Sequence, residues 1–393
     1  MRIGIFTDSY YPHISGVSTS IEMLKNALEN MGHKVYIVAP NKKFSYDKKN
    51  GIIWIPGFKP GFYEIRVAEI YSQRAMNIIE KEWHLDIVHT QTELSMDVFA
   101  RMVAKKLNIP IVRTYHTLYE DYTYYVTHGH LDKLAKKAVI RLTKKFCEKR
   151  CDELIVPTDK IKKMFEERYD IKKNMTVIPT GIDIKRFNLT PTLKKKVKEI
   201  KAQYKIKEDD FIIGSVGRVA AEKSFDKIIK NMQDLVKINN KIKFMLVGNG
   251  PIIDDLKKLA KDLKIENNII FTGLVEYDDM PAYYNTFDVM VSYSTTETQG
   301  LTIIEGLASS LPTICINDKS FREMVQNNYN GYLFNTKEEF KKYILDLIYD
   351  KELYKTMSMN AKNSTYSYSK EVFASRILQV YHQAIENKKL RKK

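Results

Sequence analysis

Two basic residues in the second half of the chain stand where a parallel α/β fold would bring them to an anion. Arg218 follows the apolar run FIIGSVG, and Lys223 precedes a segment of helical period near 224–238. Residues between a strand and the next helix lie at the carboxyl edge of a parallel sheet, where open α/β folds bind ligands. Two cations there can face a diphosphate, although either one alone is more often a solvated surface charge.

A pair of glutamates flanks a glycine further along the chain. Glu297 lies in the predicted loop after a strand, and Glu305 lies inside the next predicted helix. Gly300 stands at the start of that helix, where free N–H groups can meet a phosphate. Glu305 is deeper and could accept hydrogen bonds from the paired hydroxyls of a sugar. The glutamates, the glycine and the basic pair together predict a site for a phosphorylated ligand.

Glycines mark two further turns. Gly16 follows the predicted strand 2–6 and precedes a helix that Ser18 or Thr19 would cap, so free N–H groups there could meet an anion. A plain strand–helix turn explains Gly16 equally well. Asn249 lies in the turn GNGP at 248–251, which would bring backbone close to a ligand. The sequence has no GxGxxG dinucleotide fingerprint.

Two parallel sheets are needed to position these residues. Apolar runs of strand length alternate with segments of helical period, which predicts βαβ units. In the first half the predicted strands are 2–6, 34–40, 51–56, 86–90, 109–116, 153–158 and 176–181, with helices near 18–31, 67–82, 94–107, 131–149 and 159–168. In the second half the strands are 211–219, 241–250, 268–275, 287–294 and 311–317, with helices near 224–238, 252–264, 300–309 and 337–348.

A polar, lysine-rich stretch at 184–208 separates the two series. It predicts an α/β protein of two Rossmann-like domains facing a cleft, with boundaries at 1–190 and 191–365. The stretch 352–388 is predicted to be helical and has no strand after it. We expect this helix to cross back to the first domain, and we assign 366–393 to that domain.

Composition narrows the class of protein. The chain has 393 residues and is 44% hydrophobic, which excludes wholesale disorder. It has no apolar run long enough for a transmembrane helix, no visible signal peptide and only three cysteines, so we expect a reducing cytoplasm. The net charge is +16, and residues 1–200 carry 35 basic and 23 acidic residues, or +12. A polyanionic partner of the first half is therefore expected: a nucleotide, a nucleic acid or an anionic membrane.

The combined motifs resemble the retaining nucleotide-sugar glycosyltransferases of family four, over nearly the whole chain. They are SYYPHISGVSTS at 9–20, IPTGIDIKRF at 178–187, GRVAAEKSFD at 217–226, LVGNGP at 246–251, TGLVEYDDMPAYY at 272–284 and the E-x7-E pair Glu297 and Glu305. The resemblance implies a hexosyltransferase with the GT-B fold. The first domain would face the acceptor and the membrane, and the second would bind the nucleotide-sugar donor.

The resemblance assigns roles to individual residues. Arg218 and Lys223 would bind the donor diphosphate. Glu297 and His116 would contact the transferred sugar, and Glu305 would hold the ribose hydroxyls. Other donor-site positions would be Gly16, Asn249, Val275, Gly300, Leu301 and Thr302. Such enzymes need no cofactor and no active-site metal, and they retain the anomeric configuration.

Features of the first domain predict an acceptor at a membrane. Segment 131–151 carries eight basic residues, and a helical wheel places Ile140 among Lys133, Lys136, Lys137, Arg141 and Lys144. An apolar residue within a basic face suits anionic lipid, although a solvated helix face is the plain alternative. Tyr119 and Tyr122 lie in an aromatic run just upstream, and they could bind a lipid, stack on a sugar or simply pack.

Two stretches, RTYHTLYEDYTYYV and TETQGLTIIEGLA, are similar to bacterial diacylglycerol glucosyltransferases. This resemblance implies glucose transfer from UDP-glucose to 1,2-diacylglycerol, with anionic lipids as partners, on the inner face of the cell membrane. Another glycolipid, a polyprenyl-linked sugar, a phosphoinositide or a polysaccharide stays open as acceptor. Nucleic-acid binding is disfavoured, because no known binding motif occurs and the residues at the predicted sheet edge would stay unexplained.

Overall fold

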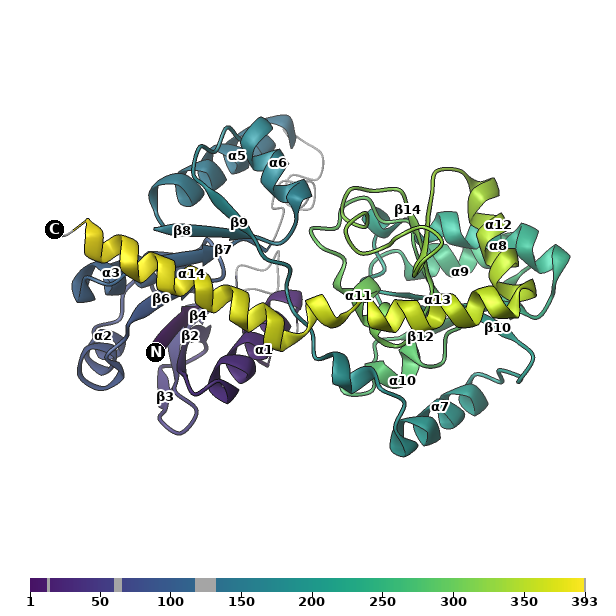
Figure 1. Ribbon diagram of the computed structural model, residues 1–393, viewed down its shortest axis with the longest axis horizontal. Coiled ribbons are helices and arrows are strands. Elements are labelled where there is room, and N and C mark those ends of the chain that lie inside the picture. The colour runs from purple at the N-terminus through teal and green to yellow at the C-terminus, as the bar shows by residue number, and fades with distance from the viewer. Residues whose placement is uncertain (13–14, 60–65, 117–131, 392–393) are drawn as a thin grey trace. The chain divides into compact units, whose positions relative to one another are not determined.

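A computed structural model describes residues 1–12, 15–59, 66–116 and 132–391 (Figure 1). The chain forms two compact units, one made of Met1–Gly181 with Lys370–Lys393 and the other of Ile182–Ser369. Each unit has its own sheet and its own apolar core on both sides of that sheet.

The first unit is built on a mostly parallel sheet. Its strand order is β3-β4-β2-β1-β6-β7-β8-β9, and β3 and β5 pair antiparallel with β4. The central strand β1 is buried almost throughout, as expected of a parallel strand covered on both faces. The bounds are β1 Arg2–Phe6, β2 Lys34–Asn41, β3 Ser45–Asp47, β4 Ile52–Phe58, β5 Val67–Ala68, β6 Ile87–Thr90, β7 Ile111–Thr114, β8 Glu153–Val156 and β9 Met175–Val177.

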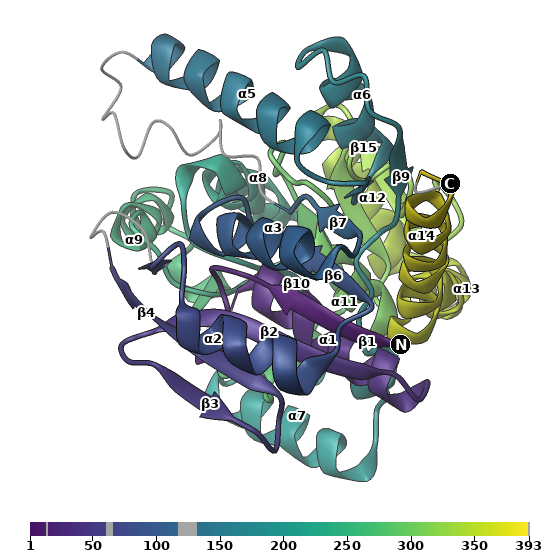
Figure 2. The same ribbon diagram turned by 90° about the vertical axis from the view of Figure 1, so that its left-hand side faces the viewer.

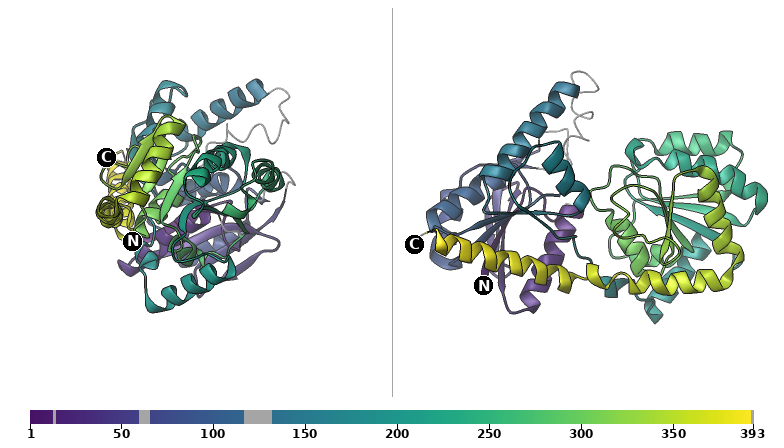
Figure 3. Two further views of the ribbon diagram at one scale, coloured as in Figure 1. Left: turned by 90° about the vertical axis from the view of Figure 1, so that its right-hand side faces the viewer. Right: turned by 45° about the horizontal axis from the view of Figure 1, so that its top comes forward.

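Helices cover both faces of this sheet (Figure 2). One face packs against α1 (Gly16–Asn30) and against the last helix, α14 (Lys370–Leu390), which lies alongside the unit in Figure 3. Apolar residues of α14, such as Ile377 and Tyr381, are fully buried there. The other face packs against α2 (Gln73–Ile78) with its π-helical extension Ile79–Trp83, α3 (Ser95–Leu107), α5 (Asp132–Lys149) and α6 (Asp159–Glu167).

The second unit has an all-parallel sheet in the order β12-β11-β10-β13-β14-β15. The bounds are β10 Phe211–Val216, β11 Ile242–Val247, β12 Ile269–Gly273, β13 Val289–Ser292, β14 Thr313–Ile316 and β15 Gly331–Phe334. Helices α8 (Phe225–Ile238), α9 (Ile253–Asp262) and α12 (Lys337–Tyr349) pack on one face. Helices α10 (Met280–Tyr284) and α11 (Leu301–Ala308) pack on the other, with α7 (Pro191–Gln203) beside α10.

The structure confirms the predicted fold class of two Rossmann-like units and the return of the last helix to the first unit. The units divide at Gly181/Ile182 and Ser369/Lys370, not at 190 and 365. The predicted helix 352–388 is wrong as one element, because α13 (Lys351–Asn363) ends before α14 begins. The backbone of Ile182 donates to the Tyr368 carbonyl at 2.8 Å, so both crossings of the chain lie side by side.

Candidate functional site

The strand order of the second sheet reverses between β10 and β13. From β10 the chain continues to β11 and β12 on one side, and β13 continues to β14 and β15 on the other. The carboxyl ends of strands at such a switch point are where open α/β sheets bind ligands. The predicted donor residues Arg218, Lys223 and Glu297 all lie in the loops after β10 and β13.

Backbone packing holds the loop that carries Arg218. A Cβ on Gly248 would lie 1.9 Å from the carbonyl oxygen of Gly217, and one on Gly250 would lie 2.2 Å from that of Val219. The Val219 N–H also donates to the Asn249 carbonyl at 3.0 Å. The turn at 248–251 therefore requires its glycines, because the two loops are in direct backbone contact.

An ion pair joins the loops after β10 and β13. Lys223 Nζ lies 2.5 Å from Glu297 Oε1, and the two side chains are 25% and 18% exposed. The Glu297 carbonyl also accepts a hydrogen bond from Ser320 Oγ at 2.8 Å. The loop after β14 thus also holds the backbone of Glu297, and both charged side chains are partly exposed to a ligand.

Helix α11 begins directly beside this pair in sequence. Gly300 has a φ of 81°, a left-handed conformation that favours glycine, and a Cβ there would lie 2.8 Å from a Phe321 ring atom. The first intrahelical bond runs from the Ile303 N–H to the Gly300 carbonyl. The N–H groups of Leu301 and Thr302 therefore have no partner inside the helix and can meet an anion.

Glu305 lies one turn further along α11. Its Oε2 accepts a hydrogen bond from the Tyr284 hydroxyl at 2.6 Å. Burial raises the pKa of Glu305 to about 7, although the Tyr284 hydroxyl favours the charged form. Within the described residues no hydrogen bond engages Oε1, so this oxygen can accept one from a ligand. Val275 is partly buried against the core on the same side of the sheet.

We call Arg218, Lys223, Asn249, Glu297, Gly300, Leu301, Thr302 and Glu305 the rim of the second unit. Within the rim, Lys223 and Glu297 contact each other in an ion pair. Gly300 caps the helix α11 that carries Glu305. His116 and Gly16 belong to the first unit. Tyr119 and Tyr122 lie outside the described residues.

In the first unit, His116 follows β7 and Gly16 opens α1. The His116 Nε2 lies 2.6 Å from the Gln91 Oε1, and burial lowers the pKa of His116 to about 4. Our expectation that Ser18 or Thr19 caps α1 is wrong. Ser15 is the cap, because its Oγ accepts from the Ser18 N–H at 3.1 Å while Ser18 Oγ accepts from the Ser15 N–H at 2.7 Å.

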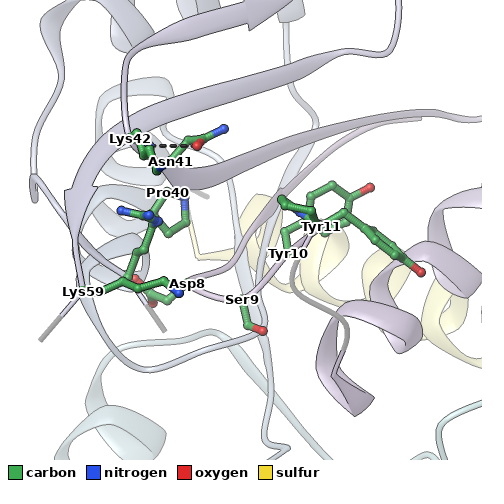
Figure 4. A pocket seen from close by; sticks show the side chains of 10 residues that line it. Asp8, Ser9, Tyr10, Tyr11, Pro40, Asn41, Lys42 and Lys59 are labelled. Atoms are coloured by element: carbon green, nitrogen blue, oxygen red, sulfur yellow. Dashed lines mark hydrogen bonds between the residues drawn. The ribbon is translucent and has the colours of Figure 1, made fainter. Parts of the chain in front are cut away.

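A cationic pocket of about 310 Å³ opens at the carboxyl ends of β1 and β2 (Figure 4). Lys42, Lys59 and Arg66 line it. Asp8 also lines it, but its carboxylate accepts hydrogen bonds from Thr92, from Ser95 and from the Met96 N–H. Burial raises the pKa of Asp8. The lining is therefore dominated by positive charge.

The structure corrects our interpretation of helix α5. Ile140 packs against the core of the first unit and does not lie within an exposed basic face, because this side of α5 covers the sheet. The exposed apolar residues are instead Leu134 and Leu142, 61% and 55% exposed. They lie among the exposed Lys137, Arg141 and Lys145, while Lys136 and Lys144 are half-buried. Lys133 is the second residue of the helix, and its side chain lies outside the described part of the chain.

Sequence reasoning missed Gln91 and the pocket residues Lys42, Lys59 and Arg66. Gln91 is the first residue after β6, and Lys42 is the first after β2. The position directly after a parallel strand is the signal that could have found both. Lys59 gives the same signal, because it is the first residue after β4. Arg66 gives no such signal, because only the pairing of β5 with β4 brings it to the pocket.

Three further features of the described residues concern metal sites, membrane-spanning helices and cysteines. No group of His, Cys, Asp and Glu side chains among them is arranged to hold a metal ion. No helix in the described part is long and apolar enough to cross a membrane. The three cysteines are buried free thiols.

Comparison with known proteins finds two family models. The model described as Glycosyltransferase Family 4 matches residues 14–186, and the model described as Glycosyl transferases group 1 matches residues 196–364. The alpha-monoglucosyldiacylglycerol synthase of Acholeplasma laidlawii is 37% identical over 406 residues, covering 100% of both chains. The enzyme of the same name from Streptococcus pneumoniae is 34% identical, covering 98% of this chain and 86% of its own.

Solved structures share the fold. The crystal structure of Anabaena Alr3699/HepE in complex with UDP and glucose has a TM-score of 0.73 at 16% identity, covering 98% of this chain and 100% of that one. The sucrose-phosphate synthase of Thermosynechococcus elongatus also has a TM-score of 0.73, at 17% identity, with 98% and 99% of the two chains covered.

Proposed function

This chain belongs to glycosyltransferase family 4, and we propose that it transfers glucose from UDP-glucose to the free hydroxyl of 1,2-diacylglycerol with retention of configuration. The full-length relatives named alpha-monoglucosyldiacylglycerol synthase support the reaction and the acceptor. The observation that carries the proposal in the structure is the rim of the second unit. There the Lys223–Glu297 pair and the open N-terminus of α11 lie at the switch point of the sheet.

Arg218 and Lys223 suit the donor diphosphate. Lys223 already forms a short ion pair with Glu297, so its Nζ is positioned before any ligand arrives. The N–H groups of Leu301 and Thr302, with the positive end of the α11 dipole, add donors for phosphate oxygens. These groups stabilise negative charge on the leaving diphosphate as the bond to the sugar breaks. The proposed reaction therefore needs no metal ion in the active site.

Glu305 suits the ribose hydroxyls of the nucleotide. A carboxylate can accept from both hydroxyls of a vicinal pair. Tyr284 holds one oxygen of Glu305 from the side of the core, which leaves the other to a ligand. Asn249 and Val275 would contact the nucleoside, as the family resemblance implies.

Glu297 and His116 are assigned to the transferred sugar. We propose that Glu297 binds sugar hydroxyls as a positioning group, since its carboxylate is already paired with Lys223. In the step itself, the bond from the anomeric carbon to the diphosphate oxygen breaks and a bond to the acceptor oxygen forms on the same face. The acceptor hydroxyl proton passes to the departing phosphate oxygen, which leaves as UDP.

The first unit is assigned to the lipid. The exposed Leu134 and Leu142 of α5 lie among basic residues, which suits insertion at an anionic membrane surface. The pocket lined by Lys42, Lys59 and Arg66 suits an anionic headgroup. We therefore propose peripheral binding at the inner face of the cell membrane, with anionic lipids as partners.

Product analysis by mass spectrometry tests the proposal. The protein would be incubated with UDP-glucose and dioleoylglycerol in detergent micelles, with and without phosphatidylglycerol, and a Glu297→Gln variant would be the inactive control. We expect a monohexosyl-diacylglycerol peak that grows with the anionic lipid. Release of UDP without a lipid product would reject the acceptor, and no UDP release with any acceptor would reject the transferase.

A further inference from the structure

A network of buried polar residues surrounds His116 in the first unit. Gln91 directly follows β6, and His116 follows β7, the neighbouring strand. The His116 Nε2 lies 2.6 Å from the Gln91 Oε1. Gln91 is 3% exposed, so water does not compete for its amide. We call Tyr381, His89, Gln91 and His116 the His116 network.

The Gln91 amide lies with its nitrogen toward His89 and its oxygen toward His116. The Gln91 Nε2 lies 3.2 Å from both ring nitrogens of His89. The neutral imidazole has one ring nitrogen that can accept a hydrogen bond from the amide N–H group, and its other ring nitrogen carries the hydrogen. With its nitrogen at His89, the amide presents its oxygen to His116. That oxygen can only accept, so the hydrogen of His116 must be on Nε2.

His89 is itself held by two elements. Its Nδ1 lies 2.6 Å from the hydroxyl of Tyr381 on α14, and its Nε2 lies 2.8 Å from Thr114 Oγ1 at the end of β7. His89 and Tyr381 are fully buried, with the rings edge to face at 5.5 Å. Burial lowers the pKa of His89 to about 3, which keeps its imidazole neutral. The returning helix α14 therefore reaches His116 through two hydrogen-bonded side chains.

We propose that Gln91 is a positioning residue that fixes the Nε2–H tautomer and the ring orientation of His116, and that His89 and Tyr381 orient Gln91. The ring atom left to accept a hydrogen bond is then His116 Nδ1. Within the described residues no other contact engages it. A neutral acceptor at this point can bind a sugar hydroxyl, a role that rests on the proposed function.

The charged and titratable groups around the network come from β6, β7, α3 and α14 and from the loop after β6. Besides His89 on β6, they are Arg113 on β7 with its partners Glu93 and Asp97, and Tyr381 on α14. Arg113 is paired with Asp97, and no carboxylate among the described residues contacts His116. A carboxylate introduced at position 91 would therefore be the new charge next to His116, and it would stabilise the imidazolium.

Nitrogen-15 NMR of the full chain, labelled at its histidine rings, tests the tautomer without any substrate. His116→Gln assigns the resonances. In the unsubstituted chain we expect Nε2 of His116 to carry the hydrogen, with titration well below pH 6.5. Gln91→Met should mix the tautomers, and Gln91→Glu should raise the pKa of His116 by at least about one unit. An unchanged tautomer in Gln91→Met, or an unchanged titration in Gln91→Glu, overturns the proposal.

Kinetics supply the second readout. Gln91→Met should lower kcat by about 10- to 100-fold, the size of effect seen when an outer partner of a ligating histidine is removed. KM for UDP-glucose should change by less than about threefold, and Gln91→Glu should move the acidic limb of the pH profile to higher pH. Tyr381→Phe, a milder change that keeps the ring, should give a smaller loss in kcat. A positioning role would be contradicted if Gln91→Met lowered the free energy of unfolding along with kcat and Gln91→Glu left the pH profile in place.

Two controls match the substitutions. Gln73→Glu makes the same change at an exposed position of the first unit, and Tyr46→Phe removes a hydroxyl bonded to Trp83 outside the network. Neither should move the resonances of His116. If the NMR results hold but no glycolipid forms, the proposed function fails and the network stands. If glycolipid forms and the tautomer is unaffected by Gln91→Met, the network fails alone.

Discussion

At the scale of single residues, Lys223 carries the charge most directly tied to the proposed leaving group. We expect Lys223→Gln to lower kcat/KM for UDP-glucose by about 100-fold, because a donor to developing charge in a protected site contributes about 3 kcal/mol. Steady-state assay of UDP release measures the loss. Lys230→Gln is the matched control, since it breaks an exposed pair with Asp226 nearby in the same loop–helix segment. Equal rates in the two variants would remove Lys223 from the site.

Glu305 should make UDP binding depend on pH. Its pKa is raised to about 7 in the free protein, and only the ionised form accepts from both ribose hydroxyls. UDP should therefore bind more weakly as the pH falls from 8 to 6, as measured by calorimetry. Glu305→Gln should bind weakly and without this dependence. A steep dependence that survives in Glu305→Gln would assign the titration to another group.

The same raised pKa has a consequence for stability. Between the ordinary value of 4.5 and about 7 the folded state binds more protons at Glu305 than the unfolded state does. The contribution of this group to the free energy of unfolding therefore falls as the pH rises through that window. Glu305→Gln should remove this slope from a urea titration series. Tyr284→Phe should raise the pKa further, because it removes the hydroxyl that favours the carboxylate.

At the scale of elements, α14 supplies part of the core of the first unit from the far end of the chain. Ile377 is fully buried against the sheet. We expect Ile377→Ala to lower the free energy of unfolding by about 2–5 kcal/mol. Urea denaturation followed by fluorescence measures it, with the exposed Gln379→Ala on the same helix as the control. A loss below 1 kcal/mol, roughly that of a surface change, would mean that α14 is not part of the cooperative unit.

Helix α5 shows how packing changes the meaning of an amphipathic pattern. The helical wheel put Ile140 in the basic face, but Ile140 is partly buried against the core of the first unit, and Leu134 and Leu142 are exposed. Composition of the segment was enough to predict a basic helix with apolar residues. Which of those residues meet solvent depends on how the helix is rotated about its axis against the core, and the periodicity of the segment alone does not specify that rotation.

At the scale of the whole molecule, the positive charge should govern attachment to membranes. Replacing the exposed Lys137, Arg141 and Lys145 by Gln should weaken binding to phosphatidylglycerol vesicles by about 3 kcal/mol, at ~1 kcal/mol per charge. Cosedimentation at low salt measures it. Replacing Lys257, Lys258 and Lys261 of α9 makes the same change in net charge on the second unit. Equal weakening by both triple variants would show that net charge, and not α5, is responsible.

The sequence alone determined the two α/β units and most of the rim of the second unit. Strand–helix alternation is local, and Arg218, Lys223, Glu297 and Gly300 each adjoin a strand end or a helix start, so position along the chain predicts position in space. Only the tertiary structure decided the rest. The Lys223–Glu297 pair, the pocket of Lys42, Lys59 and Arg66, and the path from Tyr381 to His116 join segments far apart in sequence. Strand order and helix rotation create these contacts, because they depend on how whole elements pack and not on the residues beside each side chain.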